Sequence, residues 1–206
     1  MARLPVTAGA VLCGGASRRM GVDKALMPVD GVAMAERVAR VLESTGCAPV
    51  VFVGGAGPAL TALGRPWMAD RWPGAGPVGG VVSALAALDR ATMVVVVACD
   101  LPDLTAAAVA GVIAGMAGED AGPAGMSKRP EPVDVSVADS GRLEPMLACW
   151  STAAASRIEE LLTSGHAALH DVIGRLEHVR VRVEAEALRN VNHPDDLLIW
   201  RSPRTG

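Results

Sequence analysis

Short apolar runs alternate with helix-like segments along this chain, and the alternation restricts the fold to one class. The runs in the first half are residues 8–13, 49–53, 66–69 and 93–98. Helical patterns cover 33–43, 78–88 and 105–116, and Thr105 suits the N-cap of the last one. Runs that are apolar on both faces and separated by helices are typical of a parallel sheet between two helical layers. We therefore predict an α/β fold, a three-layer α/β/α domain with a mostly parallel, Rossmann-like sheet.

The second half continues the pattern with a different composition. Residues 133–137 and 146–150 favour strands, 152–162 favour a helix, and 178–183 alternate like a half-solvated strand. Glycine, proline and charge are concentrated in 118–132, which favours a loop. A final helix is expected over 190–198, with Pro194 near its first turn. We expect a single domain over 1–206.

A glycine-rich, cationic segment follows the first apolar run. It is Leu12-Cys-Gly-Gly-Ala-Ser-Arg-Arg-Met-Gly-Val-Asp-Lys24. Gly14 and Gly15 let a ligand approach the backbone closely, and successive N–H groups in such a loop form an anion-binding nest. Arg18, Arg19 and Lys24 add positive charge. The segment predicts a phosphate-binding loop, and the alternative is a structural turn with solvated cations.

The spacing within this segment excludes two common phosphate loops. Lys24 lies nine residues after Gly15, so the segment is not the G-x-x-x-x-G-K-[ST] loop. No spaced G-x-G-x-x-G triplet is present, which disfavours a dinucleotide-binding protein.

Glycines and carboxylates also follow the other apolar runs. They are Gly54-Gly55-Ala56-Gly57, Asp70 with Pro73-Gly-Ala-Gly-Pro77, and Asp100. Ligands of open α/β sheets bind at the carboxyl ends of the strands, so these residues are expected to converge with the phosphate loop. Asp100 ends a strongly apolar run, where an unpaired carboxylate would be costly. We predict that Asp100 holds Mg²⁺ together with substrate phosphates. Asp70 is expected at the same edge, or it pairs with Arg65 or Arg71.

Composition excludes several classes of function. Half of the 206 residues are hydrophobic and the net charge is -3, so non-specific nucleic-acid binding is not indicated. The longest apolar run is too short for a membrane span, and the first seven residues lack a signal-peptide pattern. Cys13, Cys47, Cys99 and Cys149 lack paired spacing, which indicates buried thiols in a reducing cytoplasm. His166 and His170 have the i, i+4 spacing of a zinc site, but no third ligand is evident.

Residues 12–24 resemble the signature L-x-G-G-x-S-x-R-M-G-x-D-K of the molybdenum cofactor guanylyltransferase family. Ala98-Cys-Asp-Leu-Pro102 resembles the metal-binding Cys-Asp-x-Pro of that family. Asn190-Val-Asn192 resembles its closing Asn-x-Asn-Thr-Pro motif, with His193 in place of threonine. The resemblance is strong over 8–102 and thin beyond. Gly54-Gly55 stands where relatives often have asparagine, and Gly165-His-Ala-Ala168 lacks the arginine or lysine that relatives often carry.

The resemblance implies a fold of the nucleotide-diphospho-sugar transferase type and a specific reaction. GMP would pass from GTP to the phosphate of molybdenum-molybdopterin, giving molybdopterin guanine dinucleotide and pyrophosphate. Residues 1–105 would bind the nucleotide and 106–206 the acceptor, with molybdoenzymes or chaperones receiving the product. Gly14-Gly15 favours GTP, because related cytidylyltransferases often carry Ala-Gly there.

The resemblance also implies a set of site residues. The catalytic residues would be Arg19, Lys24 and Asp100, with Mg²⁺ on Asp100. The nucleotide-binding residues would be Leu12, Cys13, Gly14, Gly15, Ser17, Arg18, Lys24, Gly54, Asp70, Gly79 and Asp100. Asn190 and Asn192 would contact the acceptor, or serve only as turn formers and a helix cap. The alternatives are a nucleotidyltransferase that uses CTP or another phosphorylated acceptor, and a non-catalytic nucleotide-binding module.

Overall fold

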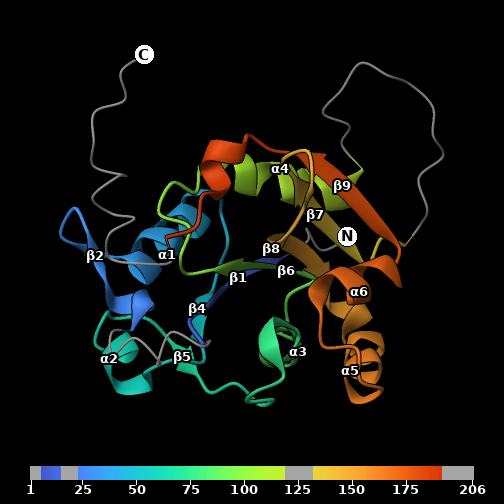
Figure 1. Cartoon of the computed structure of the whole chain (residues 1–206), viewed down its shortest axis with the longest axis horizontal. Coiled ribbons are helices and arrows are strands. Elements are labelled where there is room, and N and C mark those ends of the chain that lie inside the picture. Colours follow the sequence, from blue (N-terminus) through green and yellow to red (C-terminus); the bar gives the residue numbers. More distant parts are fainter. Residues whose placement is uncertain (1–5, 15–22, 119–131, 192–206) are drawn as a thin grey trace.

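The computed structural model describes residues 6–14, 23–118 and 132–191. Its middle layer is a seven-stranded sheet in the order β5-β4-β1-β6-β8-β7-β9 (Figure 1). The strands are β1 (Thr7–Leu12), β4 (Val50–Val53), β5 (Trp67–Met68), β6 (Met93–Ala98), β7 (Val135–Asp139), β8 (Leu143–Ser151) and β9 (His178–Arg182). Neighbouring strands are parallel except that β8 runs antiparallel to both β6 and β7. The predicted, mostly parallel sheet is confirmed.

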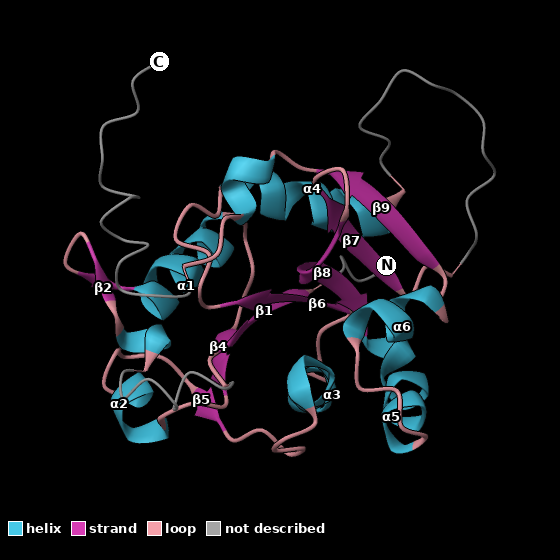
Figure 2. Ribbon diagram, viewed as in Figure 1, coloured by secondary structure: helices cyan, strands magenta, loops and turns pink. Residues whose placement is uncertain are grey.

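Helices cover both faces of this sheet (Figure 2). One face carries α1 (Met34–Ser44) and α4 (Ala106–Ala117), together with the short 3₁₀ helix η4 (Ala185–Leu188). The other carries α3 (Gly76–Ala87), α5 (Ala155–Thr163), which follows the 3₁₀ turn η3 (Thr152–Ala154), and α6 (Leu169–Gly174). The short α2 (Gly57–Thr61) lies beside β5. The predicted three-layer α/β/α architecture is therefore confirmed. Among the described residues, no helix is long and apolar enough to cross a membrane.

The central strands β1, β4 and β6 are buried on both sides because their residues are almost all apolar, whereas the edge strand β9 alternates between exposed and half-buried positions. In β6, Val95 and Val97 enter the core under α1 and α4, whereas Val94 and Val96 enter the core under α3 and α5. Each fully buried side chain of this size contributes about 1.5–3 kcal/mol of transfer free energy. The two cores therefore hold the carboxyl ends of the strands at one level, where the candidate site residues lie.

Local signals placed most helix ends to within one residue. The Thr105 side chain accepts a hydrogen bond from Ala108 N at 3.2 Å, which confirms the predicted N-cap. The helix α3 begins two residues before its predicted start, because Pro77 fits the first turn of a helix.

Several short elements were not predicted. The hairpin of β2 (Pro28–Val29) and β3 (Val32–Ala33) turns at Asp30-Gly31, whose φ angles are 51° and 78°. Both central residues of a type I′ turn need positive φ, and Asp-Gly is a favoured pair, so the signal was present. The helices α2 and α6 have five and six residues, too few for a periodic pattern. Asn190 and Val191 are not helical, and the rest of the predicted final helix lies outside the described residues.

Candidate active site

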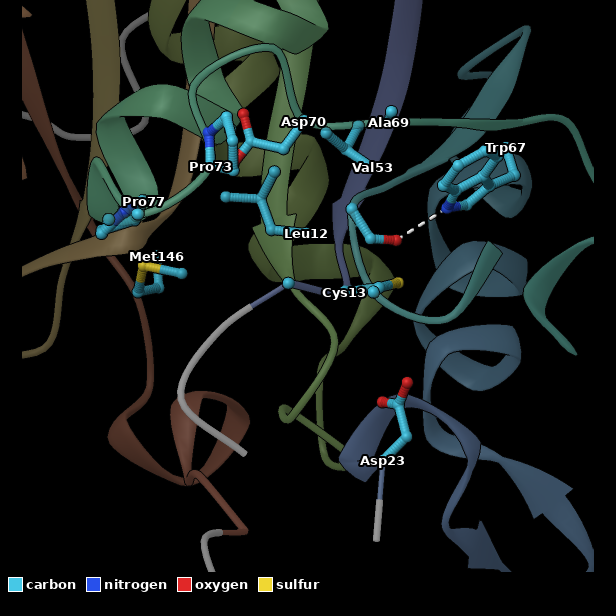
Figure 3. A pocket seen from close by; sticks show the side chains of 16 residues that line it. Leu12, Cys13, Asp23, Val53, Trp67, Ala69, Asp70, Pro73, Pro77 and Met146 are labelled. Carbon is cyan, nitrogen blue, oxygen red and sulfur yellow. Dashed lines mark hydrogen bonds between the residues drawn. The ribbon is translucent and has the colours of Figure 1, made fainter. Parts of the chain in front are cut away.

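A cavity of about 740 Å³ opens at the carboxyl ends of β1, β4 and β5 (Figure 3). Its lining comes from the segments after these strands, the first turns of α3, and one residue of β8. The lining residues are Leu12, Cys13, Gly14, Asp23, Val53, Gly54, Gly55, Trp67, Ala69, Asp70, Pro73, Gly74, Gly76, Pro77, Gly80 and Met146. This volume is in the range of small-molecule sites, roughly 300–1,000 Å³. The predicted convergence at one sheet edge thus yields a cavity of ligand size.

One wall of the cavity is a glycine turn, residues 54–57, that packs directly on the backbone after β1. Gly54 and Gly55 have φ of 73° and 72°. A Cβ on Gly55 would lie 2.7 Å from the Cys13 carbonyl oxygen, and one on Gly54 would lie 3.2 Å from Gly14 Cα. Glycine is required at both positions for conformation and for space. The surface of this wall is therefore backbone, with no side chain between Gly54 or Gly55 and the cavity.

Trp67 holds the glycine turn from the outer strand. Its indole Nε1 donates a hydrogen bond of 2.7 Å to Gly54 O (Figure 3). Its ring fills the space that a Cβ on Gly57 would need, since that atom would lie 2.7 Å from Trp67 Cζ2. Trp67 lies at the edge of the sheet, is 36% exposed and lines the cavity.

Asp70 anchors the loop that precedes α3. Its Oδ1 accepts hydrogen bonds from Trp72 N and from Ser83 Oγ, both at 2.9 Å. Its Oδ2 takes part in neither bond, and Asp70 lines the cavity as expected for a ligand contact. The alternative of an ion pair with Arg65 is wrong, because Arg65 pairs with Glu36 and Glu43. No ion pair with Arg71 is seen among the described residues.

Asp100 and Lys24 form a charged pair beside the cavity rather than in its lining. Asp100 follows β6, and Lys24 begins the 3₁₀ helix η2 (Lys24–Leu26). Lys24 Nζ lies 3.9 Å from Asp100 Oδ2, with the two side chains 17% and 20% exposed. Burial raises the pKa of the Asp100 carboxyl, and the Lys24 ammonium partly offsets that effect. A second cation at Asp100 would stabilise the charged carboxylate further.

The donor atoms present fit a divalent cation at Asp100. Asp100 Oδ1 is buried and has no hydrogen-bond partner among the described residues. Those residues include no group of three or more His, Cys, Asp or Glu that could hold a metal without help. The remaining ligands would therefore be substrate phosphates and water, which is the coordination that Mg²⁺ prefers.

The remaining predicted site residues either lie outside the described residues or do not line the cavity. Gly15, Ser17, Arg18, Arg19 and Asn192 lie outside the described residues. Gly79 is not among the lining residues, whereas the next residue, Gly80, is. A Cβ on Gly79 would lie 2.8 Å from Trp72 O, so glycine at this position lets α3 pack against the preceding loop. Asn190 is exposed, but Val191 N donates a hydrogen bond of 3.0 Å to Asp100 O, which brings this segment beside Asp100.

The histidine alternative receives no support from the described residues. His166 pairs with Asp171, and no group of potential metal ligands surrounds it there. The four cysteines described are free and buried, as the sequence predicts. The sequence missed Gly80 and Met146 as lining residues, because nothing local distinguishes them from residues of a helix and a strand that pack the core.

Comparison with known proteins identifies the family. Residues 9–181 match the family model of the MobA-like NTP transferase domain. The chain belongs to this family of nucleotidyltransferase enzymes. It is 33% identical to the probable molybdenum cofactor guanylyltransferase of Pelotomaculum thermopropionicum over 211 residues, 96% of this chain and 95% of the relative. The resemblance found in the sequence is thereby confirmed.

Two further similarities agree with this membership. The probable molybdenum cofactor guanylyltransferase of Opitutus terrae is 44% identical over 102 residues, and the match spans about half of each chain (48% of this one, 50% of the relative). The structure of molybdopterin-guanine dinucleotide biosynthesis protein A from Archaeoglobus fulgidus superposes with a TM-score of 0.69 at 25% identity, covering 93% of this chain and 95% of that one. This MobA-like chain therefore has the nucleotidyltransferase fold predicted for it.

Proposed function

We propose that this enzyme transfers GMP from GTP to the phosphate of molybdenum-molybdopterin, forming molybdopterin guanine dinucleotide and pyrophosphate. The observation that carries the proposal is the Lys24–Asp100 pair beside a cavity with a main-chain glycine wall. The names of the similar proteins support the choice of substrates. We place the enzyme in the cytoplasm, where its four free, buried thiols stay reduced.

The cavity suits the nucleoside part of GTP. Gly14 and Gly55 offer backbone groups without intervening side chains, while Gly54 N and Gly54 O are hydrogen-bonded to Met68 O and Trp67 Nε1. Asp70 offers a carboxylate acceptor whose Oδ2 takes no part in the bonds that anchor the loop. Guanine carries adjacent N–H donors on its pairing edge, and a site that bonds such donors rejects a base that lacks them. This supports GTP over CTP.

The charged pair suits the triphosphate. Lys24 would neutralise charge on the phosphates and on the departing pyrophosphate, together with Arg19 of the phosphate loop. When bound at Asp100, Mg²⁺ would supply charge neutralisation at the α-phosphate. The acceptor phosphate oxygen forms the new bond to the α-phosphorus as the bond to the bridging oxygen of pyrophosphate breaks. Positioning and charge do this work, so no protein nucleophile is needed.

The acceptor is assigned to the second half of the chain. Met146 of β8 lines the cavity on the side away from Trp67 (Figure 3). The segment with Asn190 lies against Asp100 through the Val191 N–H. These positions are beside the place where the α-phosphate would lie, so residues 106–206 are proposed as the acceptor-binding half, which would pass the product to molybdoenzymes or their chaperones.

Equilibrium binding of GTP, CTP and ATP, with and without Mg²⁺, tests this function. We expect GTP to bind most tightly and Mg²⁺ to strengthen its binding. Asp100→Asn should abolish the strengthening of GTP binding by Mg²⁺ and lower turnover with molybdopterin by more than about 100-fold. Loss of a residue that only orients a metal ligand already lowers metal affinity or activity by about 10–100-fold, and loss of the ligand itself should cost more. Preference for CTP would retain the chemistry and change the substrate. Binding of no triphosphate would contradict the proposal.

A further inference from the structure

Asp23 makes two contacts that transfer chemistry alone does not require. It directly precedes Lys24 and lines the cavity (Figure 3). Its Oδ1 accepts a hydrogen bond of 3.0 Å from Ala25 N, which caps the helix η2. Its Oδ2 accepts one of 3.3 Å from Ala56 N, a residue 33 positions further along the chain. One carboxylate thus joins two separate segments of the site.

The two joined segments carry different parts of the site. On one side is Lys24, whose ammonium group faces Asp100 at 3.9 Å. On the other side is the glycine turn, which packs on Cys13 and Gly14 and is held at its far end by Trp67. Asp23 therefore links the glycine turn to the segment that carries Lys24 of the charged pair.

We propose that Asp23 is a positioning residue that keeps Lys24 in register with the glycine turn, so that the base and the triphosphate of one nucleotide are bound together. This inference rests on the proposed function. A carboxylate meets the need because both of its oxygens accept hydrogen bonds, here from two backbone N–H groups. An amide accepts at one oxygen only and turns an N–H toward the other donor.

The charge of Asp23 by itself acts in the opposite direction. A carboxylate in the cavity lining repels a triphosphate, so its removal should strengthen GTP binding if electrostatics alone decides. Loss of positioning should weaken GTP binding instead. Removal of the Asp23 charge should therefore raise GTP affinity if electrostatics decides and lower it if positioning decides.

Two variants of the full chain separate the contacts. Asp23→Asn keeps the size of the side chain and loses one acceptor, whereas Asp23→Ser keeps a good helix cap but is too short to reach Ala56. GTP and guanosine affinities are measured by titration calorimetry with Mg²⁺ present. Exchange of the Ala25 and Ala56 amide protons is measured by NMR without ligand. Asp89→Asn, in the exposed turn at the amino end of β6, is the matched control for loss of one charge.

We expect GTP to bind about tenfold more weakly to both variants, with a smaller change for guanosine, which corresponds to one lost hydrogen bond. The Ala56 amide should exchange about tenfold faster in Asp23→Ser while the melting temperature stays near that of the parent. Asp89→Asn should match the parent. Equal or tighter GTP binding by Asp23→Asn and Asp23→Ser would overturn the inference, and so would an unchanged Ala56 exchange rate. If the parent itself bound no GTP, the proposed function would fail, and the exchange rates would still decide whether Asp23 joins the two segments.

Discussion

At the scale of the residue, the site depends on positions where no side chain fits. Gly55 combines a φ of 72° with a Cβ position only 2.7 Å from Cys13 O, so both conformation and space exclude other residues. Gly64 shares the left-handed conformation, at a φ of 84°, but a Cβ there meets nothing within 4 Å. Substitution of Gly64 by alanine therefore measures the cost of the left-handed conformation alone. The same substitution at Gly55 adds the cost of a steric clash.

Gly64→Ala should lower the free energy of unfolding by about 1–2 kcal/mol, the usual cost of a left-handed residue with a Cβ. Gly55→Ala should cost more than this and should also weaken GTP binding, because the glycine turn must move away from Cys13. Urea unfolding and nucleotide titration of both variants measure the two effects. Equal stability losses with unchanged GTP affinity would show that the close approach at Gly55 does not matter.

At the scale of the element, Arg65 fastens the helix α1 to the segment before β5. Its Nε donates a hydrogen bond of 2.6 Å to Glu36 Oε2, and its Nη2 donates one of 3.0 Å to Glu43 Oε2. Burial alone would raise the pKa of Glu36, but hydrogen bonds from Arg65 and Arg40 outweigh burial and lower it. The hydrogen bond from Arg65 also lowers the pKa of Glu43.

Replacement of Arg65 by methionine should destabilise the protein by about 1–3 kcal/mol at pH 7, because hydrogen bonds to charged partners are lost. Both carboxyls have lowered pKa values in the folded state. Their contribution is therefore complete above the ordinary glutamate pKa of about 4.3 and disappears as the pH falls through the lowered values. Urea unfolding from pH 7 to pH 3 should show the difference between parent and Arg65→Met shrinking below about pH 4. A difference independent of pH would contradict this.

At the scale of the whole molecule, the two proposed halves share one sheet and both cores. Residues 1–105 supply β5, β4, β1 and β6, and the remainder supplies β8, β7 and β9. The halves meet where β6 and β8 pair over five residues, from Met93–Ser151 to Val97–Leu147. Each core contains residues from both halves. Neither half can bury its apolar surface alone.

The chain should therefore unfold in one cooperative transition. Far-UV circular dichroism reports the helices and sheet. Tryptophan fluorescence reports all four tryptophans, among them Trp150, which is fully buried in the core under α3 and α5. The two urea transitions should coincide, as two-state unfolding requires. Two separate midpoints would show that the nucleotide and acceptor halves are independent folding units.

Much of this architecture could be predicted because its signals are local. The apolar run that forms β6 was predicted from Met93 to Ala98 with both ends correct, and Thr105 carried the cap of the next helix in its own side chain. Asp100, Gly54 and Asp70 were expected at one edge because parallel strands end together. The elements that were missed, such as α2 and α6, are too short for periodicity and are held by tertiary packing.

The sequence by itself determined the three-layer α/β class, the longer strands and helices, and the edge at which ligands would bind, because apolar periodicity and turn residues act over a few neighbouring positions. Only the tertiary structure decided how the site is fastened. Asp23 meets Ala56, Asp70 meets Ser83, Trp67 meets Gly54, and Met146 reaches the cavity from β8. In the three hydrogen bonds made by Asp23, Asp70 and Trp67, the two partners are 13 or more residues apart in the sequence. The residues around one partner therefore do not predict the other. Such contacts exist only after burial of the two cores has brought the strand ends together.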